Sequence, residues 1–562
     1  MDWRAFFRGS VSSVARLAGV AILSSWLLSV AQAQTAAPQS SGEFVTVQTK
    51  AGSLRGRALA DSNLSLFQGV PYARPPVGDL RWRPPAPVVA WSGSRDALAP
   101  GSPCPQTGRL ASSNEDCLYL NIWAPKNDGR TPAPVMVFLH GGGQRNSAAH
   151  EYKADRLVTG GTPVIYVGIN YRLNIFAFMA HQQLSAEEPS LGSGNYAALD
   201  QIEALRWVRD NIASFGGDPN NVTLFGESGG AQAVCVLMAS PAAKGLFRRA
   251  ISQSGPCQWQ FYPSLAASEE RGVDVATQLG CSGPETLSCL RALPAGAVLA
   301  KERGAQSDTA AAQPSWGGGV LPIPVREAFA TGQFNRVPFI QGSNTDEGLF
   351  QLATQYAQKG QVLASERYPE ILKQYLGASR VEAVMQRYPL AKFGSVLEAL
   401  AVVLSDSGMV TNNRIGLCNM RLANQLAAPH TSVFAYEFAD RSAPYPAPIF
   451  DAPNAVPGAA HTKDLSYIFN QGPLTDQQRA LSDQMIKYWT NFAATGDPNG
   501  PGLPHWPAFK VDREEVMLLA LGEPVSDPSF ASRHNCAFWA QMGFATLAGP
   551  YPTPTAAGPE YK

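Results

Sequence analysis

The chain has 562 residues, of which 45% are hydrophobic and 16% are charged, and its formal net charge is zero. This is the composition of a globular protein and not of a disordered or fibrous one. No block of basic residues stands out, so the sequence does not indicate a nucleic-acid partner. With 51 Gly and 44 Pro, the chain favours one large domain with long, defined loops.

The first 33 residues have the order of a secretory signal peptide. Three arginines precede an apolar run over residues 17–30, and the small residues Ala31 and Ala33 follow it. The run is short for a bilayer span, and no later segment has the pattern of one. We expect cleavage near Ala33, a single mature domain over residues 34–562, and a secreted or periplasmic protein. An uncleaved N-terminal anchor is the alternative.

Export to an oxidising compartment permits disulfide bonds among the eight cysteines. They are Cys104, Cys117, Cys235, Cys257, Cys281, Cys289, Cys418 and Cys536. None belongs to a CxxC pair, which argues against a zinc ribbon or a thioredoxin-like centre. The close pairs Cys104/Cys117 and Cys281/Cys289 are each spaced to close a small loop.

Five apolar runs rich in Val, Ile and Phe are typical of buried strands. They cover residues 134–139, 163–169, 222–225, 249–253 and 337–341. Helical patterns lie between them, over residues 196–215, where apolar residues recur every three or four positions, and over residues 230–238. This alternation predicts an α/β fold with a large, mostly parallel sheet covered by helices on both faces.

Two further segments frame this predicted sheet. Residues 44–57 have the pattern of an antiparallel hairpin ahead of it. Residues 349–406 are helical in pattern, and we expect them to form a lid or cap.

The strongest motif is Gly226-Glu227-Ser228-Gly229-Gly230, a G-x-S-x-G sequence that follows a predicted strand and opens a predicted helix. In that context the chain turns sharply and exposes the serine hydroxyl, and the helix N-terminus adds positive potential beside it. Gly226 and Gly230 lack the Cβ that would collide with the neighbouring strand and helix. The motif predicts Ser228 as a catalytic nucleophile.

At this point the chain resembles the type-B carboxylesterase/cholinesterase family of α/β-hydrolases. The matching segments are spread over most of the mature sequence. They include Gln68–Ala73, Glu115–Asn121, His140–Gly143, Asn170–Arg172, Asp200–Asn221, Gly342–Gly348, His461 and Cys536–Trp539. The resemblance implies the α/β-hydrolase fold.

The family's catalytic order is Ser…Glu…His, which implies Glu347 as the acid and His461 as the base. Among the seven histidines, only His461 has the family's neighbours, and His150 and His534 are the alternatives. In the implied mechanism His461 takes the proton of Ser228 as its oxygen attacks an ester carbonyl, and Glu347 orients the imidazole. Water activated by His461 then hydrolyses the acyl-enzyme, with no metal or organic cofactor.

The resemblance also implies an oxyanion hole of backbone N–H donors from Gly142, Gly143 and Gly229. His140, which begins the His-Gly-Gly-Gly loop, is expected to support that loop. Glu227, beside Ser228, resembles a buried carboxylate that tunes the site electrostatically.

Other matches imply structural roles. The family's buried ion pair is expected between Glu115 and Arg172. Its three disulfides are expected as Cys104–Cys117, Cys281–Cys289 and Cys418–Cys536. Cys235 is then expected to be a small buried hydrophobe, although a fourth bridge to Cys257 is open.

Several residues depart from the family pattern. Gly229 replaces the usual Ala after the nucleophile, Gln144 stands where an aromatic residue is usual, and Asn174 and Ala177 stand where glycines are usual. We hypothesise a more polar pocket, with Gln144, Arg145 and Glu227 as candidate substrate contacts. Arg145 either attracts a carboxylate of a polycarboxylic or aromatic-acid ester or simply faces solvent.

The sequence therefore predicts a secreted serine carboxylesterase acting on a small-molecule ester. No aromatic residue lies between Cys104 and Cys117, which argues against choline esters. A lipase acting at lipid interfaces is one alternative, an amidase or thioesterase another. A non-catalytic adhesion protein of the same fold is a third, although the expected triad is complete here. The natural ester, the lid behaviour and the oligomeric state are left open.

Overall fold

Most of the chain after the predicted signal peptide is described by a computed structural model. The described residues are 43–59, 62–126, 131–258, 262–304, 313–409, 415–446, 457–469 and 471–546. Residues from Gly42 to Lys562 form one compact unit. The predicted signal peptide and its cleavage site lie outside the described residues. Within the described part, no helix has the length and apolar character needed to span a bilayer.

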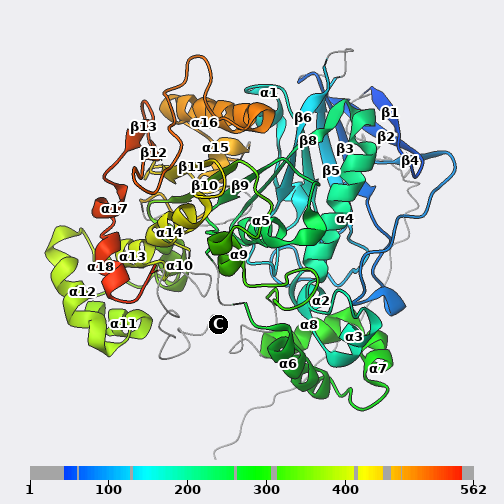
Figure 1. Cartoon of the computed structure of the whole chain (residues 1–562), viewed down its shortest axis with the longest axis horizontal. Coiled ribbons are helices and arrows are strands. Elements are labelled where there is room, and N and C mark those ends of the chain that lie inside the picture. Colours follow the sequence, from blue (N-terminus) through cyan, green and yellow to red (C-terminus); the bar gives the residue numbers. More distant parts are fainter. Residues whose placement is uncertain are drawn as a thin grey trace, which may run out of the picture. The chain divides into compact units, whose positions relative to one another are not determined.

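Thirteen strands of the described residues form a single sheet (Figure 1). They are β1 Phe44–Gln48, β2 Ser53–Leu59, β3 Leu64–Pro71, β4 Ser94–Asp96, β5 Tyr119–Pro125, β6 Ala133–Leu139, β7 Ile165–Ile169, β8 Gly217–Glu227, β9 Arg249–Gln253, β10 Phe339–Asn344, β11 Val433–Phe438, β12 Val516–Leu519 and β13 Val525–Asp527. Their order is β1-β2-β3-β5-β7-β6-β8-β9-β10-β11-β12-β13, with β4 paired to β2. The sheet is parallel from β7 through β12 in that order and antiparallel along β1, β2, β3, β5 and β7 and at β12–β13.

The five strands predicted from apolar runs are β6 to β10, and they lie side by side in the parallel centre of the sheet. β6 and β7 are continuously apolar, as expected for strands with helices on both faces, and the mostly parallel α/β fold is confirmed. The predicted hairpin is β1 and β2, where burial alternates along β1 as expected at a half-solvated edge.

Some helices of the described residues cover the two faces of this sheet, and others pack next to it. They are α1 Asp155–Thr159, α2 Asn174–Phe178, α3 Gln182–Glu187, α4 Tyr196–Asn211, α5 Gly229–Ala239, α6 Leu265–Gln278, α7 Thr286–Ala292, α8 Ala295–Gly304, α9 Val325–Thr331, α10 Glu347–Gln355, α11 Arg367–Leu376, α12 Val381–Arg387, α13 Val396–Ser407, α14 Leu417–Ala427, α15 Leu465–Ile468, α16 Asp476–Thr495, α17 Phe530–Arg533 and α18 Cys536–Gln541.

Alternation along β6 separates two hydrophobic cores. Val135 and Val137 belong to the core that includes residues of α4, α5, α9 and α14. Met136 and Phe138 belong to the core that includes residues of α15 and α16. Successive side chains of a strand point to opposite faces, so one strand contributes to both layers. Figure 1 shows α16 and α4 on different sides of the strands.

The helical prediction for residues 349–406 is confirmed by α10 to α13. These helices share a third core with α18, which includes Leu352, Leu400, Leu404 and Trp539. The helices therefore form a packed layer next to the segment that follows β10.

The eight cysteines form four disulfides, where three were expected. Cys104–Cys117, Cys281–Cys289 and Cys418–Cys536 are present as expected. The expectation that Cys235 is a free buried residue is wrong, because it is bonded to Cys257. Gly255 permits this approach, since a Cβ there would lie 2.5 Å from the Cβ of Ala231 in α5.

The expected ion pair between Glu115 and Arg172 is also wrong. Arg172 follows β7 and forms a bidentate pair with Asp200 in α4, with N–O distances of 2.7 and 2.8 Å. Glu115 instead pairs with Arg81, 2.8 Å from Arg81 Nε. Glu115 and Arg172 therefore belong to two different ion pairs. Sequence similarity identified both residues but not their partners.

Candidate active site

The turn between β8 and α5 holds Ser228 in a strained conformation. Its φ is 55° and its ψ is −122°, a region that costs a non-glycine residue about 1–3 kcal/mol. The Ser228 N–H donates to the carbonyl of Gln253 over 2.9 Å, and its carbonyl accepts from the N–H of Gln232 over 3.0 Å. These two bonds hold the turn between the end of β9 and the first turn of α5.

Close backbone approach explains the two outer glycines of the motif. A Cβ at Gly230 would lie 2.0 Å from the carbonyl oxygen of Leu139, and one at Gly226 would lie 2.6 Å from the backbone of Gly230. Real Cβ atoms do not come so near to backbone, so only glycine fits at either position. The steric reason predicted for both glycines is confirmed.

The structure brings Ser228, His461 and Glu347 into one hydrogen-bonded row. His461 Nε2 lies 2.8 Å from Ser228 Oγ, and His461 Nδ1 lies 2.6 Å from Glu347 Oε2. Glu347 is completely buried, whereas Ser228 and His461 retain 7% and 6% of their surface exposed. The row therefore begins at the fully buried Glu347 and ends at Ser228, which keeps a small exposed area.

The segment that carries Glu347 is cross-linked to the segment that carries His461. The N–H of Asn344 donates to Glu347 Oε1 over 2.8 Å, and its side-chain amide donates to the carbonyl of Ala460 over 2.8 Å. Asp346 accepts from the N–H of Ala459 over 2.8 Å. The carboxylate and the imidazole are thus held in register by the residues next to them.

Asp464 is a buried carboxyl group near the row that sequence reasoning did not single out. Its side chain accepts from Gln253 Nε2 over 2.8 Å and from Asn344 Nδ2 over 3.2 Å. Burial raises its pKa, and the negative charge of Glu347 raises it further. Its place three residues after His461 was the only available signal.

Glu227 and His461 influence each other's titration. Glu227 Oε1 lies 3.3 Å from His461 Nε2. Burial raises the pKa of Glu227 to about 8. Burial lowers the pKa of His461, but the charges of Glu347 and Glu227 outweigh it and raise that pKa to about 9. When Glu227 is protonated its contribution vanishes, so the pKa of His461 is then lower and the neutral imidazole is easier to form.

The predicted oxyanion loop runs next to the nucleophile turn. Gly142, Gly143 and Gln144 have φ values of 90°, 61° and 62°, and Ser147 has a φ of 86°. A Cβ at Gly229 would lie 2.7 Å from the backbone nitrogen of Gln144 and 2.9 Å from that of Gly143. The absence of a side chain at Gly229 therefore lets these nitrogens approach the start of α5.

The two residues after the glycines differ in their surroundings. Gln144 is buried, and its side-chain amide donates to the carbonyl of Gly229 over 3.1 Å. Arg145 is half-buried and makes no ion pair with a described residue. Both residues were candidate substrate contacts. Gln144 makes a hydrogen bond within the protein, whereas Arg145 has no ion-pair partner among the described residues.

His150 and His534, the two alternatives for the base, are not bonded to Ser228 among the described residues, and neither is His140 of the predicted oxyanion loop. His534 is buried and contacts Asp406 at 2.6 Å and Glu437 at 3.3 Å. His140 stacks on Tyr171, with 4.4 Å between ring centroids, and its carbonyl accepts from the Tyr171 hydroxyl over 2.6 Å. His150 is partly buried and burial lowers its pKa.

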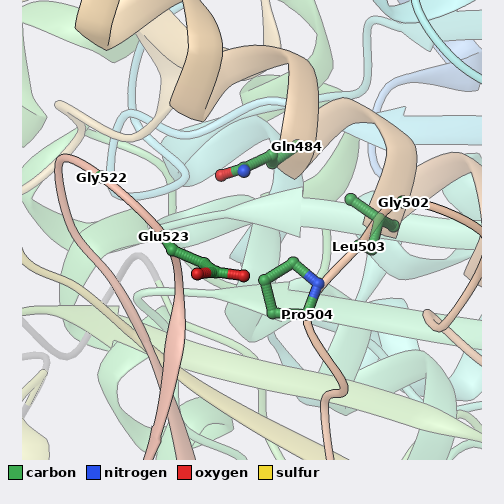
Figure 2. Close-up of a pocket in the computed structure, with 6 residues that line it drawn as sticks. All are labelled: Gln484, Gly502, Leu503, Pro504, Gly522 and Glu523. Atoms are coloured by element: carbon green, nitrogen blue, oxygen red, sulfur yellow. The ribbon is translucent and has the colours of Figure 1, made fainter.

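Figure 2 shows a cavity of about 520 Å³. It is lined by Gln484 of α16, by Gly502, Leu503 and Pro504 after that helix, and by Gly522 and Glu523 between β12 and β13. None of these residues belongs to the Ser228–His461–Glu347 row. The cavity therefore does not enter the account of the site.

The strand order, with a strained serine turn between a central parallel strand and the helix after it, defines an α/β-hydrolase. A family model described as the carboxylesterase family matches residues 43–539. The chain belongs to the carboxylesterase family, in its type-B branch, and is a carboxylic ester hydrolase.

Individual relatives agree with this assignment. The chain is 34% identical to a fumonisin B1 esterase of Sphingopyxis macrogoltabida, over 84% of this chain and 85% of that protein. It is 31% identical to carboxylesterase 1C of Mus musculus, over 88% of this chain and 92% of that protein. A solved structure of a PNB esterase has a TM-score of 0.70 and 29% identity, over 87% of this chain and 99% of that one.

Proposed function

We propose that the chain is an exported serine carboxylesterase that forms an acyl-enzyme on Ser228. The observation that carries the proposal is the pair of short bonds that joins Ser228 Oγ to His461 Nε2 and His461 Nδ1 to Glu347. A hydroxyl is a weak nucleophile until a base takes its proton, and an imidazole needs a carboxylate to hold its tautomer and stabilise its positive form.

The steps follow from these positions. His461 accepts the Ser228 proton as Oγ attacks the ester carbonyl, and then donates it to the departing alcohol. His461 next takes a proton from water as the water attacks the acyl carbonyl, and returns this proton to Ser228 Oγ as the bond between that oxygen and the acyl group breaks and the acid leaves. The backbone N–H groups of Gly142, Gly143 and Gly229 are proposed to stabilise the oxyanion at both tetrahedral stages, where one such donor contributes about 10²–10³ in rate.

Hydrolysis of a panel of p-nitrophenyl esters tests this proposal. We expect turnover by the mature protein and a loss of at least about 10⁴-fold in Ser228→Ala. Thr223→Ala is a matched control, because Thr223 is a buried hydroxyl residue of β8, the strand that precedes Ser228, and lies outside the row. Equal activity of Ser228→Ala and the wild type would contradict the proposal.

We propose that the preferred ester carries a negative charge. Arg145 is half-buried within the predicted oxyanion loop and has no ion-pair partner among the described residues, so its charge is available to a substrate carboxylate. Polycarboxylic and aromatic-acid esters have such a group. The relatives include a fumonisin B1 esterase and a cocaine esterase of Oryctolagus cuniculus.

Arg145→Ala tests the charge preference when carboxylate-bearing and neutral esters are compared. We expect kcat/KM to fall about ten-fold for the charged ester and to stay unchanged for the neutral one. Arg57→Ala, which removes an exposed cation from β2, serves as the control. An equal effect of Arg145→Ala on both esters would refute the preference.

We also propose export. Four disulfides are typical of proteins that mature outside the cytoplasm. Sequencing the N-terminus of the protein from the periplasm and from the medium should give Gln34 as the first residue. A first residue of Met1 in the membrane fraction would favour the uncleaved anchor.

A further inference from the structure

The oxyanion loop, residues 140–147, is not stabilised by regular secondary structure of its own. Gly142, Gly143 and Gln144 are consecutive residues with left-handed φ, and Ser147 is a fourth. Gln144 and Ser147 carry side chains, so their conformations persist only where surrounding groups impose them. The contacts that impose them are therefore part of the catalytic design if the loop holds the oxyanion.

Gln106 holds the far end of this loop through both ends of its side-chain amide. Its Oε1 accepts from the N–H of Ser147 over 2.8 Å, and its Nε2 donates to the carbonyl of Ser147 over 3.0 Å. The same Nε2 donates to the carbonyl of Cys104 over 3.0 Å. Gln106 is only 2% exposed, so water does not compete for these bonds.

Asn174 holds the near end of the loop. Its N–H donates to the carbonyl of Gln144 over 2.9 Å, and its side-chain amide donates to the carbonyl of Pro105 over 2.6 Å. Its φ is 51°, which suits Asn better than most residues. The departure from the usual glycine at this position thus adds a bond that glycine does not provide.

A third carboxamide completes the attachment. Asn170 Oδ1 accepts from the N–H of Ala149 over 2.8 Å, and its Nδ2 donates to the carbonyl of Ser102 over 3.1 Å. The side-chain amides of Gln106 and Asn170 therefore each bond the oxyanion loop or the residues that follow it on one side and the backbone of residues 102–105 on the other. Asn174 makes the same link with its backbone N–H on the loop and its side-chain amide on Pro105. An amide serves here because it offers a donor and an acceptor in one rigid group.

Residues 102–105 are themselves fixed by a covalent bond. Cys104 is joined to Cys117, and both cysteines are completely buried. The segment is a rigid reference against which the amides position the loop.

We propose that Gln106 and Asn174 are positioning residues that couple the disulfide-closed segment to the oxyanion loop and hold the N–H groups of Gly142 and Gly143 in place. The proposal rests on the proposed function, because it assigns the loop to oxyanion stabilisation. Neither residue touches the reacting atoms. Their effect is confined to the stage at which the carbonyl oxygen becomes negative.

Two ketones that differ only in fluorination separate this role from a general structural one. A trifluoromethyl ketone adds the Ser228 hydroxyl across its carbonyl to form a hemiketal whose oxygen occupies the oxyanion hole. The methyl ketone of the same chain binds as an intact carbonyl. In Gln106→Ala we expect kcat for p-nitrophenyl acetate and the affinity for the trifluoromethyl ketone to fall about ten-fold, with the methyl ketone affinity within about two-fold of wild type.

Asn174→Gly is the milder second variant. Glycine keeps the left-handed φ and the N–H bond to Gln144, and removes the side-chain bonds to the carbonyl of Pro105 and from the N–H of Phe176. We expect the same selective loss, smaller than in Gln106→Ala. This variant decides the matter if Gln106→Ala does not fold.

Asn499→Ala is the matched control. The Asn499 amide bonds both the N–H and the carbonyl of Trp506, over 2.7 and 2.9 Å, which repeats the geometry of Gln106 at a different loop. We expect a lower melting temperature and unchanged kcat and ketone affinities.

The positioning role is overturned if Gln106→Ala and Asn174→Gly keep kcat and trifluoromethyl ketone affinity within two-fold of wild type, or lose affinity for both ketones equally. Labelling of wild-type Ser228 by an organophosphonate is measured alongside. A labelled wild type with unaffected variants overturns only the positioning role, whereas an unlabelled and inactive wild type overturns the proposed function.

Discussion

At the scale of single residues, the row of Ser228, His461 and Glu347 lies in an unusually acidic environment. Glu227, Glu347 and Asp464 are all buried near one imidazole. Their charges raise the pKa of His461. Burial raises the pKa of Glu227, and the charges of Asp464 and Glu347 add to this effect. The base therefore works at neutral pH only if some of this negative charge is neutralised by protons.

Glu227→Gln tests this electrostatic balance. The amide keeps the shape of the side chain and removes a charge that raises the pKa of His461, so that pKa should fall. Since activity needs neutral His461, we expect the acid limb of the pH profile of kcat/KM to move to lower pH. A limb that stays in place or moves to higher pH would show that Glu227 does not set the pKa of the base.

Gly229→Ala tests the close approach of the oxyanion loop to α5. The new Cβ would lie 2.7 Å from the nitrogen of Gln144 and 2.9 Å from that of Gly143, so the loop must retreat. We expect kcat to fall about ten-fold or more. Gly296→Ala is the control, because a Cβ there meets open space. Full activity of Gly229→Ala would contradict the tight fit.

At the scale of elements, the disulfide Cys235–Cys257 ties α5 to the segment that follows β9. The bridge is buried and closes 22 residues, whereas Cys281–Cys289 closes 8 and includes a less buried cysteine. The loop-entropy model gives about 3.4 kcal/mol for the first and about 2.5 kcal/mol for the second. We expect the urea midpoint to fall more in Cys235→Ala/Cys257→Ala than in Cys281→Ala/Cys289→Ala. A larger fall in Cys281→Ala/Cys289→Ala would mean that the Cys235–Cys257 disulfide adds little to the stability of the fold.

A buried histidine connects helix α13 to strand β11 of the sheet. His534, next to α17, contacts Asp406 of α13 and Glu437 of β11. Burial lowers its pKa, but the two carboxylates outweigh burial and raise the pKa to about 10. The charged contacts therefore stabilise the fold fully below the ordinary histidine pKa of about 6.5, and this stabilisation is lost as the pH rises through about 10.

His534→Gln tests this connection by melting at several pH values. The variant should melt below the wild type at pH 6, and the difference should shrink as the pH approaches 10.5, because wild-type His534 then becomes neutral. His505→Gln, at an exposed histidine, should match the wild type throughout. A difference that grows between pH 6 and pH 10.5 would exclude a charged His534.

At the scale of the whole molecule, the sequence was sufficient for the centre of the fold. Apolar runs identified β6 to β10, because a strand that is buried on both faces has no solvent-facing positions that require polar residues. The strands β3, β4, β5, β11, β12 and β13 were not predicted. β12 and β13 have only 4 and 3 residues, too few for a periodic pattern.

The pairing of distant residues was harder to predict than their presence. Similarity to the family identified Glu115 and Arg172 as buried ions, but their partners Arg81 and Asp200 depend on how loops meet in space. The same holds for Cys257, which reaches Cys235 because Gly255 allows close packing. The attachment of the oxyanion loop through Gln106 also joins residues 41 positions apart, beyond the reach of any local motif.

The central claim is that Ser228 carries the acyl group, and intact mass spectrometry after rapid acid quenching tests it most directly. The protein is mixed with p-nitrophenyl acetate, quenched within milliseconds, and digested to locate the added group. We predict one acetyl group per chain, on the peptide that contains Ser228, and none in Ser228→Ala. Turnover without a modified Ser228, or an acetyl group retained by Ser228→Ala at another catalytic residue, would contradict the account.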